Sequence, residues 1–202
     1  IGHTGSGKST MIQHLNGLMK ATSGALYYNG ENIYDEKYNL RQLRNNVGLV
    51  FQYPEHQLFE IDVLTDVCFG PKNQGLTEEE CKKRAIEALE LVGLSNTGKK
   101  KAKNFSLGMR QRLAIAIALI GDPEFLILDE PTRGIDVGAK AEIYQLINNL
   151  AKQGMAIIVV SSELPEVIGI SDRIVTFCEG ELTGEFMQED ATQEKLLQSA
   201  TR

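Results

Sequence analysis

The sequence predicts an α/β fold with a mostly parallel core sheet and helices on both faces, and three observations lead to this prediction. First, the apolar runs 125–128 and 156–160 contain no polar residue, which is typical of strands buried on both faces of a parallel sheet. Second, residues 143–150 repeat apolar side chains at helical spacing between those runs. Third, a glycine-rich loop at 2–9 leads directly into a helical pattern. Strands that alternate with helices define the α/β class.

Length and composition favour a single core-bearing domain. The chain has 202 residues, of which 42% are hydrophobic and 24% are charged, an ordinary globular composition. We expect one domain over 1–202, with a helical subdomain at about 53–118. Four lysines between residues 99 and 103 predict a solvated loop.

Several classes of function are disfavoured by the same composition. The net charge of −6 argues against a nucleic-acid partner, because phosphates demand a basic face. Cys68, Cys81 and Cys178 are odd in number and scattered, so we expect neither disulfides nor zinc. The longest apolar run, 113–120, is too short to span a bilayer. Any membrane contact must therefore come through a partner.

Turn and capping signals predict the remaining elements. The Asn29-Gly30 and Glu179-Gly180 pairs indicate hairpin turns. Thr77 followed by Glu80 predicts a capping box at a helix start, and Thr192 predicts a cap for a last short helix. We expect helices over 9–18, from 77 to about 93, over 110–120 and after 192, and strands over 25–28, 47–51, 173–177 and 181–186.

The run at 2–9 fits a phosphate-binding loop. It reads Gly-His-Thr-Gly-Ser-Gly-Lys-Ser, which matches Gly-x-x-x-x-Gly-Lys-Ser/Thr. Its glycines let backbone N–H groups close around phosphate oxygens, Lys8 reaches the terminal phosphates, and Ser9 offers a hydroxyl to Mg²⁺. We expect the His3 side chain to face solvent. The predicted nucleotide-binding residues here are Gly2, His3, Thr4, Gly5, Ser6, Gly7, Lys8, Ser9 and Thr10.

A second motif supports nucleotide binding. Residues 126–130 read Leu-Ile-Leu-Asp-Glu, an apolar strand that ends in two acids. This is the usual partner of a phosphate loop, with Asp129 directed to the metal and Glu130 to a water. The alternative is a glycine-rich turn and an unrelated buried strand. In P-loop proteins the loop follows a central strand, so we expect that strand, and the group that stacks on the base, upstream of Ile1.

Between these motifs lies Ser106-Leu107-Gly108-Met109, which resembles the signature motif of ATP-binding cassette (ABC) ATPases. A Ser hydroxyl, a Gly backbone and a helix N-terminus can present donors to a γ-phosphate, which in the family belongs to the opposing subunit. Taken alone, Ser106 also reads as the N-cap of a buried helix. Departures are Leu107 where Gly is usual and Met109 where Gln is usual.

Other ABC landmarks follow in order along the whole chain. Gln52 matches the glutamine that touches Mg²⁺ and the attacking water, and Glu130 matches the general base. Gly134-Ile135-Asp136 resembles the D-loop, which crosses between subunits. Ser162 stands where the family has its switch histidine, and the resemblance implies weak hydrolysis at such a site.

The subfamily resemblance is composite. Residues 1 to about 94 resemble energy-coupling-factor ATPases, which drive vitamin and cobalt or nickel uptake. The signature stretch is more similar to exporters, and residues from 132 onward resemble the second half of sugar-import ATPases. A natural mosaic and an assembled or designed chain both remain open.

The resemblance implies an ATP-binding and hydrolysing subunit that powers an ABC membrane transporter for a vitamin, metal ion or sugar. It implies ATP and Mg²⁺ as cofactors, and as partners a membrane-spanning subunit and a second ABC ATPase, at the cytoplasmic face of the membrane. The implied catalytic residues are Glu130, Gln52 and Ser162, the metal residues are Ser9, Gln52 and Asp129, and Ser106, Gly108 and Asp136 would contact nucleotide.

Two alternatives stay open. One is a regulatory subunit that binds ATP and dimerises but hydrolyses poorly, for which Ser162 is the main support. The other is a non-transport ABC protein that acts on DNA or ribosomes, which the acidic balance disfavours. A GTPase is disfavoured because the chain lacks the guanine-reading Asn/Thr-Lys-x-Asp motif.

Overall fold

The structure, a computed structural model, describes residues 1–3 and 5–201. It divides into two compact units. Unit 1 comprises Ile1–Arg44 and Ile158–Arg202, and unit 2 comprises Asn45–Ile157. None of the helices in the described part of the chain has both the length and the apolar content that crossing a bilayer requires.

Unit 2 is organised around parallel strands, as predicted. Strand β3 (Val47–Val50) pairs in parallel with β4 (Phe125–Asp129). The strand order is β3-β4-β5, and β5 (Ala156–Val160) begins in unit 2 and ends in unit 1. Leu126, Ile127 and Leu128 are almost completely buried. Val50 lies opposite Leu128, so the carboxyl ends of β3 and β4 meet at one edge of the sheet.

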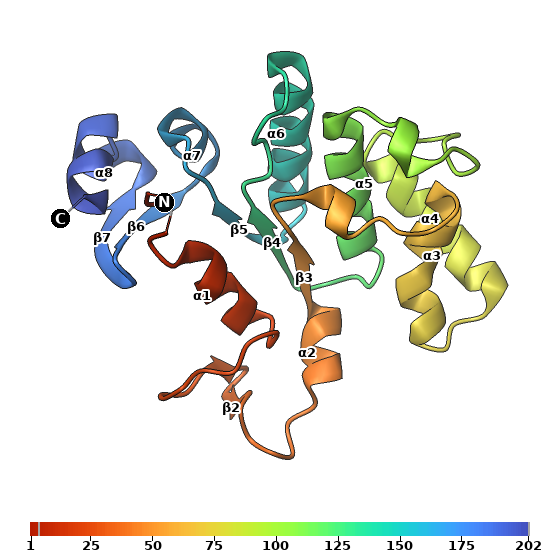
Figure 1. The fold of residues 1–202 in the computed structure, drawn as a ribbon, viewed down its shortest axis with the longest axis horizontal. Helices are drawn as coiled ribbons and strands as arrows, with labels where there is room; N and C mark the ends of the chain where they lie inside the picture. The colour runs from red at the N-terminus through yellow and green to blue at the C-terminus, as the bar shows by residue number, and fades with distance from the viewer. Residues whose placement is uncertain (4, 202) are drawn as a thin grey trace. The chain divides into compact units, whose positions relative to one another are not determined.

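Helices α3 (Val63–Asn73), α4 (Glu78–Leu91) and α5 (Leu107–Leu119) pack on one another and form the helical part of unit 2 (Figure 1). Helix α5 also packs on β3 and on α6 (Val137–Lys152). Its middle is buried on nearly all sides, as expected from its apolar composition. Two short 3₁₀ helices, η1 (Pro54–His56) and η2 (Ala102–Asn104), lie in the connecting loops.

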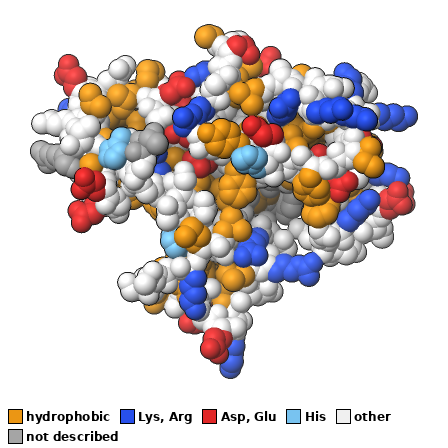
Figure 2. All heavy atoms as spheres, in the orientation of Figure 1, with side chains coloured by type: hydrophobic (Ala, Val, Ile, Leu, Met, Phe, Trp, Pro, Cys, Tyr) orange, Lys and Arg blue, Asp and Glu red, His pale blue; other side chains and the backbone are white. Residues whose placement is uncertain are grey.

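The surface of unit 2 is rich in cations around these helices. Figure 2 shows Lys and Arg side chains gathered on the right of the view, where Figure 1 draws the helices of unit 2. Lys99, Lys100, Lys101 and Lys103 are all exposed, which confirms the prediction of a solvated loop.

Unit 1 contains the phosphate loop, helix α1 (Lys8–Leu15) and two antiparallel hairpins. The first pairs β1 (Tyr27–Tyr28) with β2 (Glu31–Asn32), and the second pairs β6 (Arg173–Cys178) with β7 (Glu181–Met187). Helix α8 (Gln193–Ala200) packs on this second hairpin and on α7 (Leu164–Ile170). The turn residues Asn29, Gly30, Glu179 and Gly180 all have positive φ, which confirms both predicted turns.

Several elements differ from the prediction. The helix expected over 9–18 ends at Leu15, because Gly17 turns the chain at φ 67° close to Leu43. Strand β5 is partly exposed over 156–159 rather than fully buried. The capping box at Thr77 is half formed, since the Glu80 carboxylate pairs with Arg84.

The sequence patterns also left three helices unpredicted: α2 (Leu40–Asn46), α3 and α7. Helix α3 carries Pro71 in its second half and α7 begins with a proline in its first turn. Short helices interrupted by proline show little helical periodicity. A short 3₁₀ helix, η3 (Gln188–Asp190), precedes α8.

Candidate nucleotide-binding site

The phosphate loop of unit 1 is attached to strand β6 by backbone hydrogen bonds. Ile1 N donates to Val175 O at 2.7 Å, and Phe177 N donates to Ile1 O at 2.7 Å. These two bonds form one step of a parallel ladder. Gly180 N, in the turn after β6, donates to Ser6 O at 3.0 Å. The β6–β7 hairpin therefore holds both the entry and the middle of the loop.

The glycines of the phosphate loop are required for two different physical reasons. A Cβ on Gly2 would lie 2.3 Å from Phe177 O and 2.7 Å from Ser6 Oγ, so a side chain does not fit beside β6. Gly5 and Gly7 have φ 87° and 96°, a region that residues with a Cβ rarely adopt. Gly7 is also the N-cap of α1.

The side chain of Lys8 folds back into the phosphate loop that precedes it. Its side chain is buried, and Nζ donates to Gly2 O at 2.5 Å, to His3 O at 2.9 Å and to Ser6 Oγ at 3.3 Å. The ammonium is therefore held among the loop carbonyls. Together with the positive end of the α1 dipole, it makes the loop suited to a bound anion.

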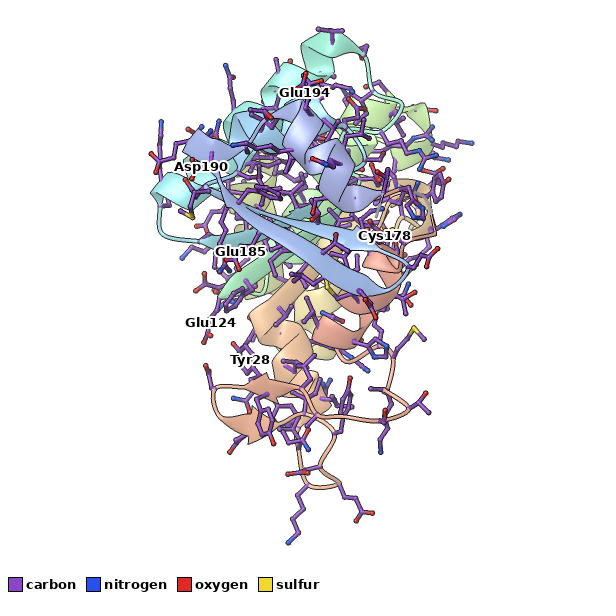
Figure 3. All side chains as sticks on the ribbon, turned by 90° about the vertical axis from the view of Figure 1, so that its left-hand side faces the viewer. Tyr28, Glu124, Cys178, Glu185, Asp190 and Glu194 are labelled. Carbon is purple, nitrogen blue, oxygen red and sulfur yellow. The ribbon has the colours of Figure 1, made fainter. Side chains whose placement is uncertain are left out.

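The neighbouring residues are placed as follows. Ser9 and Thr10 are exposed in the first turn of α1. His3 is exposed, with Nε2 3.8 Å from Sγ of Cys178, which Figure 3 shows at the turn end of the β6–β7 hairpin. Thr4, which the sequence analysis also assigns to the loop, lies outside the described residues.

The segment after β5, also in unit 1, contains Ser162. Its neighbour Ser161 is fully buried, donates through Oγ to Glu166 Oε2 at 2.5 Å, and accepts from Glu163 N at 3.0 Å. These bonds tie the bend to α7, while Ser162 is exposed. Neither Ser161 nor Glu166 was predicted from the sequence as a site residue. Ser161 directly follows the apolar run 156–160 and shortly precedes Pro165. A Ser ahead of a Pro is a signal of a helix start, and this signal could have identified Ser161 and the Glu166 that follows.

In unit 2, the structure brings Gln52, Asp129 and Glu130 to the same edge of the sheet. Gln52 lies two residues after the end of β3, Asp129 is the last residue of β4, and Glu130 follows it; β3 and β4 run parallel. Asp129 and Glu130 are buried. Glu130 has φ 49°, a left-handed conformation that a non-glycine residue rarely adopts and that is frequent at functional sites.

The signature turn and the D-loop lie together in unit 2. Ser106 caps α5 by accepting from Met109 N at 3.2 Å, and Asp136 caps α6 by accepting from Ala139 N at 3.0 Å. A Cβ on Gly108 would lie 2.7 Å from the Cβ of Ala139, so the starts of the two helices are in close contact. The N-cap interpretation of Ser106 is therefore confirmed as geometry.

The donors near the predicted magnesium residues are few. Across residues 1–3 and 5–201, no group of three or more His, Cys, Asp and Glu side chains is arranged to hold a metal ion. Magnesium does not need one, because it is usually bound through one or two carboxylates, waters and substrate phosphates. Asp129 and Gln52 place oxygen donors at one edge of the sheet, which fits an ion that arrives with a nucleotide.

A family profile described as "ABC transporter" matches residues 1–133, which include the phosphate loop, the signature turn and the acid-bearing strand. The chain belongs to the ABC transporter family. The order of motifs and the α/β fold with its parallel sheet agree with that membership.

Curated relatives narrow the likeness within the ABC family. An energy-coupling factor transporter ATP-binding protein EcfA2 from Caldanaerobacter subterraneus subsp. tengcongensis is 48% identical over 184 residues, covering 90% of this chain and 64% of its own length. The EcfA2 of Clostridium perfringens is 46% identical over 204 residues, covering 97% of this chain and 72% of its own length. The chain thus spans about two thirds of the length of these relatives.

Solved structures show the same ABC fold. The cbiO1 protein from Clostridium perfringens, described as part of the ABC transporter complex cbiONQ, matches with a TM-score of 0.85 and 34% identity over 99% of this chain and 78% of its own. The ATP-binding cassette MJ0796, a dimer bound to ADP and Pi in a post-hydrolysis state, matches with a TM-score of 0.82 and 30% identity over 93% of this chain and 83% of its own.

These comparisons refine the composite resemblance. The two EcfA2 relatives match nearly the whole chain, so the energy-coupling-factor likeness continues well beyond residue 94. The expected likeness of residues 132 onward to sugar-import ATPases receives no support from them.

Proposed function

We propose that this chain is the ATP-binding and ATP-hydrolysing part of an energy-coupling-factor transporter for a vitamin, cobalt or nickel. The observation that carries the proposal is the buried Lys8 ammonium, held 2.5–3.3 Å from three oxygens of a glycine loop at a helix N-terminus. The likeness to EcfA2 relatives supports the transporter class.

The proposed division of labour follows the chemistry of phosphoryl transfer, which depends on positioning and charge rather than on covalent catalysis. Lys8 and the N–H groups of the loop hold the β- and γ-phosphates. Ser9, Gln52 and Asp129 are proposed to hold Mg²⁺, which neutralises phosphate charge when it is bound. Glu130 orients and polarises the attacking water.

The proposed partners follow from the family. Ser106, Gly108 and Asp136 contact the nucleotide that is bound by a second ABC ATPase subunit. A membrane-spanning subunit docks on the two ATPase subunits at the cytoplasmic face of the membrane. The adjoining starts of α5 and α6 support this assignment, because Ser106 and Asp136 lie exposed at those two starts.

Substitution of the proposed general base tests the function. In the full-length protein, Glu130→Gln keeps the shape of the side chain but removes the carboxylate. We expect turnover to fall about 10²–10⁴-fold, with Mg-ATP still bound. Glu87→Gln, at an exposed acid on α4, is the matched control and leaves turnover at the parental value. Unchanged hydrolysis in Glu130→Gln would contradict the proposed role.

Ser162 is proposed to limit the rate of this hydrolysis. A Ser hydroxyl is shorter than an imidazole, and loss of one preorganised donor to developing charge costs about 10²–10³-fold in rate. We therefore expect Ser162→His to raise turnover with little change in ATP affinity. Turnover that is equal before and after the substitution would show that residue 162 is not rate-limiting.

A further inference from the structure

The loop after β3 is closed by the side chain of Gln57. Its Oε1 accepts from Phe51 N at 3.1 Å, and its Nε2 donates to Leu49 O at 3.2 Å. Backbone groups of residues two apart on a strand point to the same side, so one amide side chain bridges them as a neighbouring strand would. Both the oxygen and the nitrogen of this half-buried amide therefore bond to the backbone at the end of β3.

The residue that this bridge affects most directly is Gln52. Gln52 follows Phe51 in the chain, so the bond from Phe51 N to Gln57 constrains the backbone from which Gln52 projects. Between Gln52 and Gln57 the chain forms the 3₁₀ helix η1, which starts with the buried Pro54. The loop leaves the strand and returns to it within one short turn.

A second anchor fixes the segment that follows. The buried carboxylate of Asp66, in α3, accepts from Phe59 N at 3.2 Å and from Glu60 N at 3.0 Å. Gln57 thus holds the loop to the sheet, and Asp66 holds its continuation to the helical part of unit 2. Of these two anchors, the Gln57 bridge is adjacent to Gln52.

We propose that Gln57 is a positioning residue for Gln52, and this inference rests on the function proposed above. The amide of Gln57 is bonded at both ends to the backbone at the end of β3. It holds the end of β3 so that the Gln52 side chain starts from a fixed backbone. Small misplacements of a group that orients a reaction can lower its rate about 10²-fold.

The chemistry of the bridge predicts which substitutions break it. Gln57→Ala removes both hydrogen bonds. Gln57→Glu keeps an acceptor for Phe51 N but loses the donor to Leu49 O and sets a carboxylate beside that carbonyl. We expect both variants to lower kcat by about 10–10²-fold while Mg-ATP affinity changes by less than about threefold, since most ground-state contacts come from the phosphate loop.

A double-mutant cycle in the full-length protein tests the proposal. The proteins are the parent, Gln52→Ala, Gln57→Ala and the double variant, with Gln153→Ala at an exposed glutamine after α6 as control. Turnover, Mg-ATP affinity and melting temperature are measured for each. We expect Gln57→Ala to lower kcat and the double variant to match Gln52→Ala, because the bridge acts through Gln52.

The outcomes distinguish the role of Gln52 from that of Gln57. If Gln52→Ala turns over like the parent, the role proposed for Gln52 is wrong. If Gln52→Ala is slow but Gln57→Ala and Gln57→Glu are not, the positioning role of Gln57 is wrong while the function stands. Effects that multiply in the double variant would also contradict the proposal, because Gln57 would then act independently of Gln52. If Gln57→Ala does not fold, Gln57→Glu replaces it in the cycle.

Discussion

Two helix starts in this molecule combine glycine with serine, yet their N-termini are capped in different ways. Helix α1 begins after Gly7, which caps it at φ 96° without a side-chain hydrogen bond. Helix α5 begins after Ser106, whose hydroxyl accepts from Met109 N at 3.2 Å. The first start directs backbone donors and a buried ammonium into its own loop. The second start already has a protein cap.

The glycine at the entry of the phosphate loop and the glycine in the first turn of α5 also have different neighbours. Gly2 has no room for a Cβ because the carbonyl of Phe177 would lie 2.3 Å from it. Gly108 has no room because the Cβ of Ala139 would lie 2.7 Å away on α6. The first glycine brings a loop close to a strand, and the second brings two helices together. A glycine in such a motif therefore indicates that the backbone lies close to another element, and the atoms around it show which element that is.

The largest expected effect is at the loop entry. Gly2→Ala forces a methyl group against backbone atoms of β6, and overpacking of this kind destabilises by about 1–3 kcal/mol and occasionally more. Because the shift moves the loop itself, we expect Mg-ATP binding to be lost as well. Thermal unfolding and an ATP titration measure the two effects. A variant that melts and binds like the parent would show that the loop does not lie against β6.

The next effect is at the signature turn. Gly108→Ala places its methyl group against another methyl group on α6, so we expect a loss of about 1–3 kcal/mol in stability. Gly169→Ala is the matched control, because Gly169 lies inside α7 and, apart from its chain neighbours and its own helix backbone, no atom lies within 4 Å of where an alanine methyl group would be. An alanine at this position raises helix propensity, and we expect it to stabilise by about 0.5–1 kcal/mol. Denaturant unfolding of the two variants should therefore shift in opposite directions.

A smaller effect is expected from the cap of α5. Ser106→Ala removes the acceptor for Met109 N, which costs about 0.5–2 kcal/mol at an N-cap. Ser106→Thr keeps a hydroxyl and should retain most of the stability. Denaturant midpoints measure the difference, and equal midpoints for the Ala and Thr variants would show that the Ser106 cap contributes nothing to folding.

Much of the fold could be predicted because its signals are local. The hairpin turns at Asn29-Gly30 and Glu179-Gly180 require positive φ, and those residue pairs permit it. The caps at Thr77 and Thr192 each accept the expected backbone N–H. The parallel pairing of β3 with β4 follows from the apolar runs that form them.

The side-chain contacts that hold the candidate site in place were harder to predict from the sequence. Gln57 and Glu166 act through side-chain contacts that no periodicity encodes, because the loop path must be known before the partner can be named. The partial exposure of β5 was missed for a related reason. An apolar run predicts a strand, but its burial depends on which neighbours cover it.

We propose that the loop before α1 holds the phosphates of Mg-ATP and that Lys8 supplies its cation. The most direct measurement is the Mg-ATP affinity of the full-length protein with Lys8→Ala, beside Lys20→Ala at an exposed lysine in the same unit. Loss of a charge-assisted contact costs about 1.5–3 kcal/mol, so Lys8→Ala should weaken binding about tenfold or more, while Lys20→Ala binds like the parent. Equal affinities for Lys8→Ala and the parent, with both proteins folded, would show that Lys8 does not hold the phosphates.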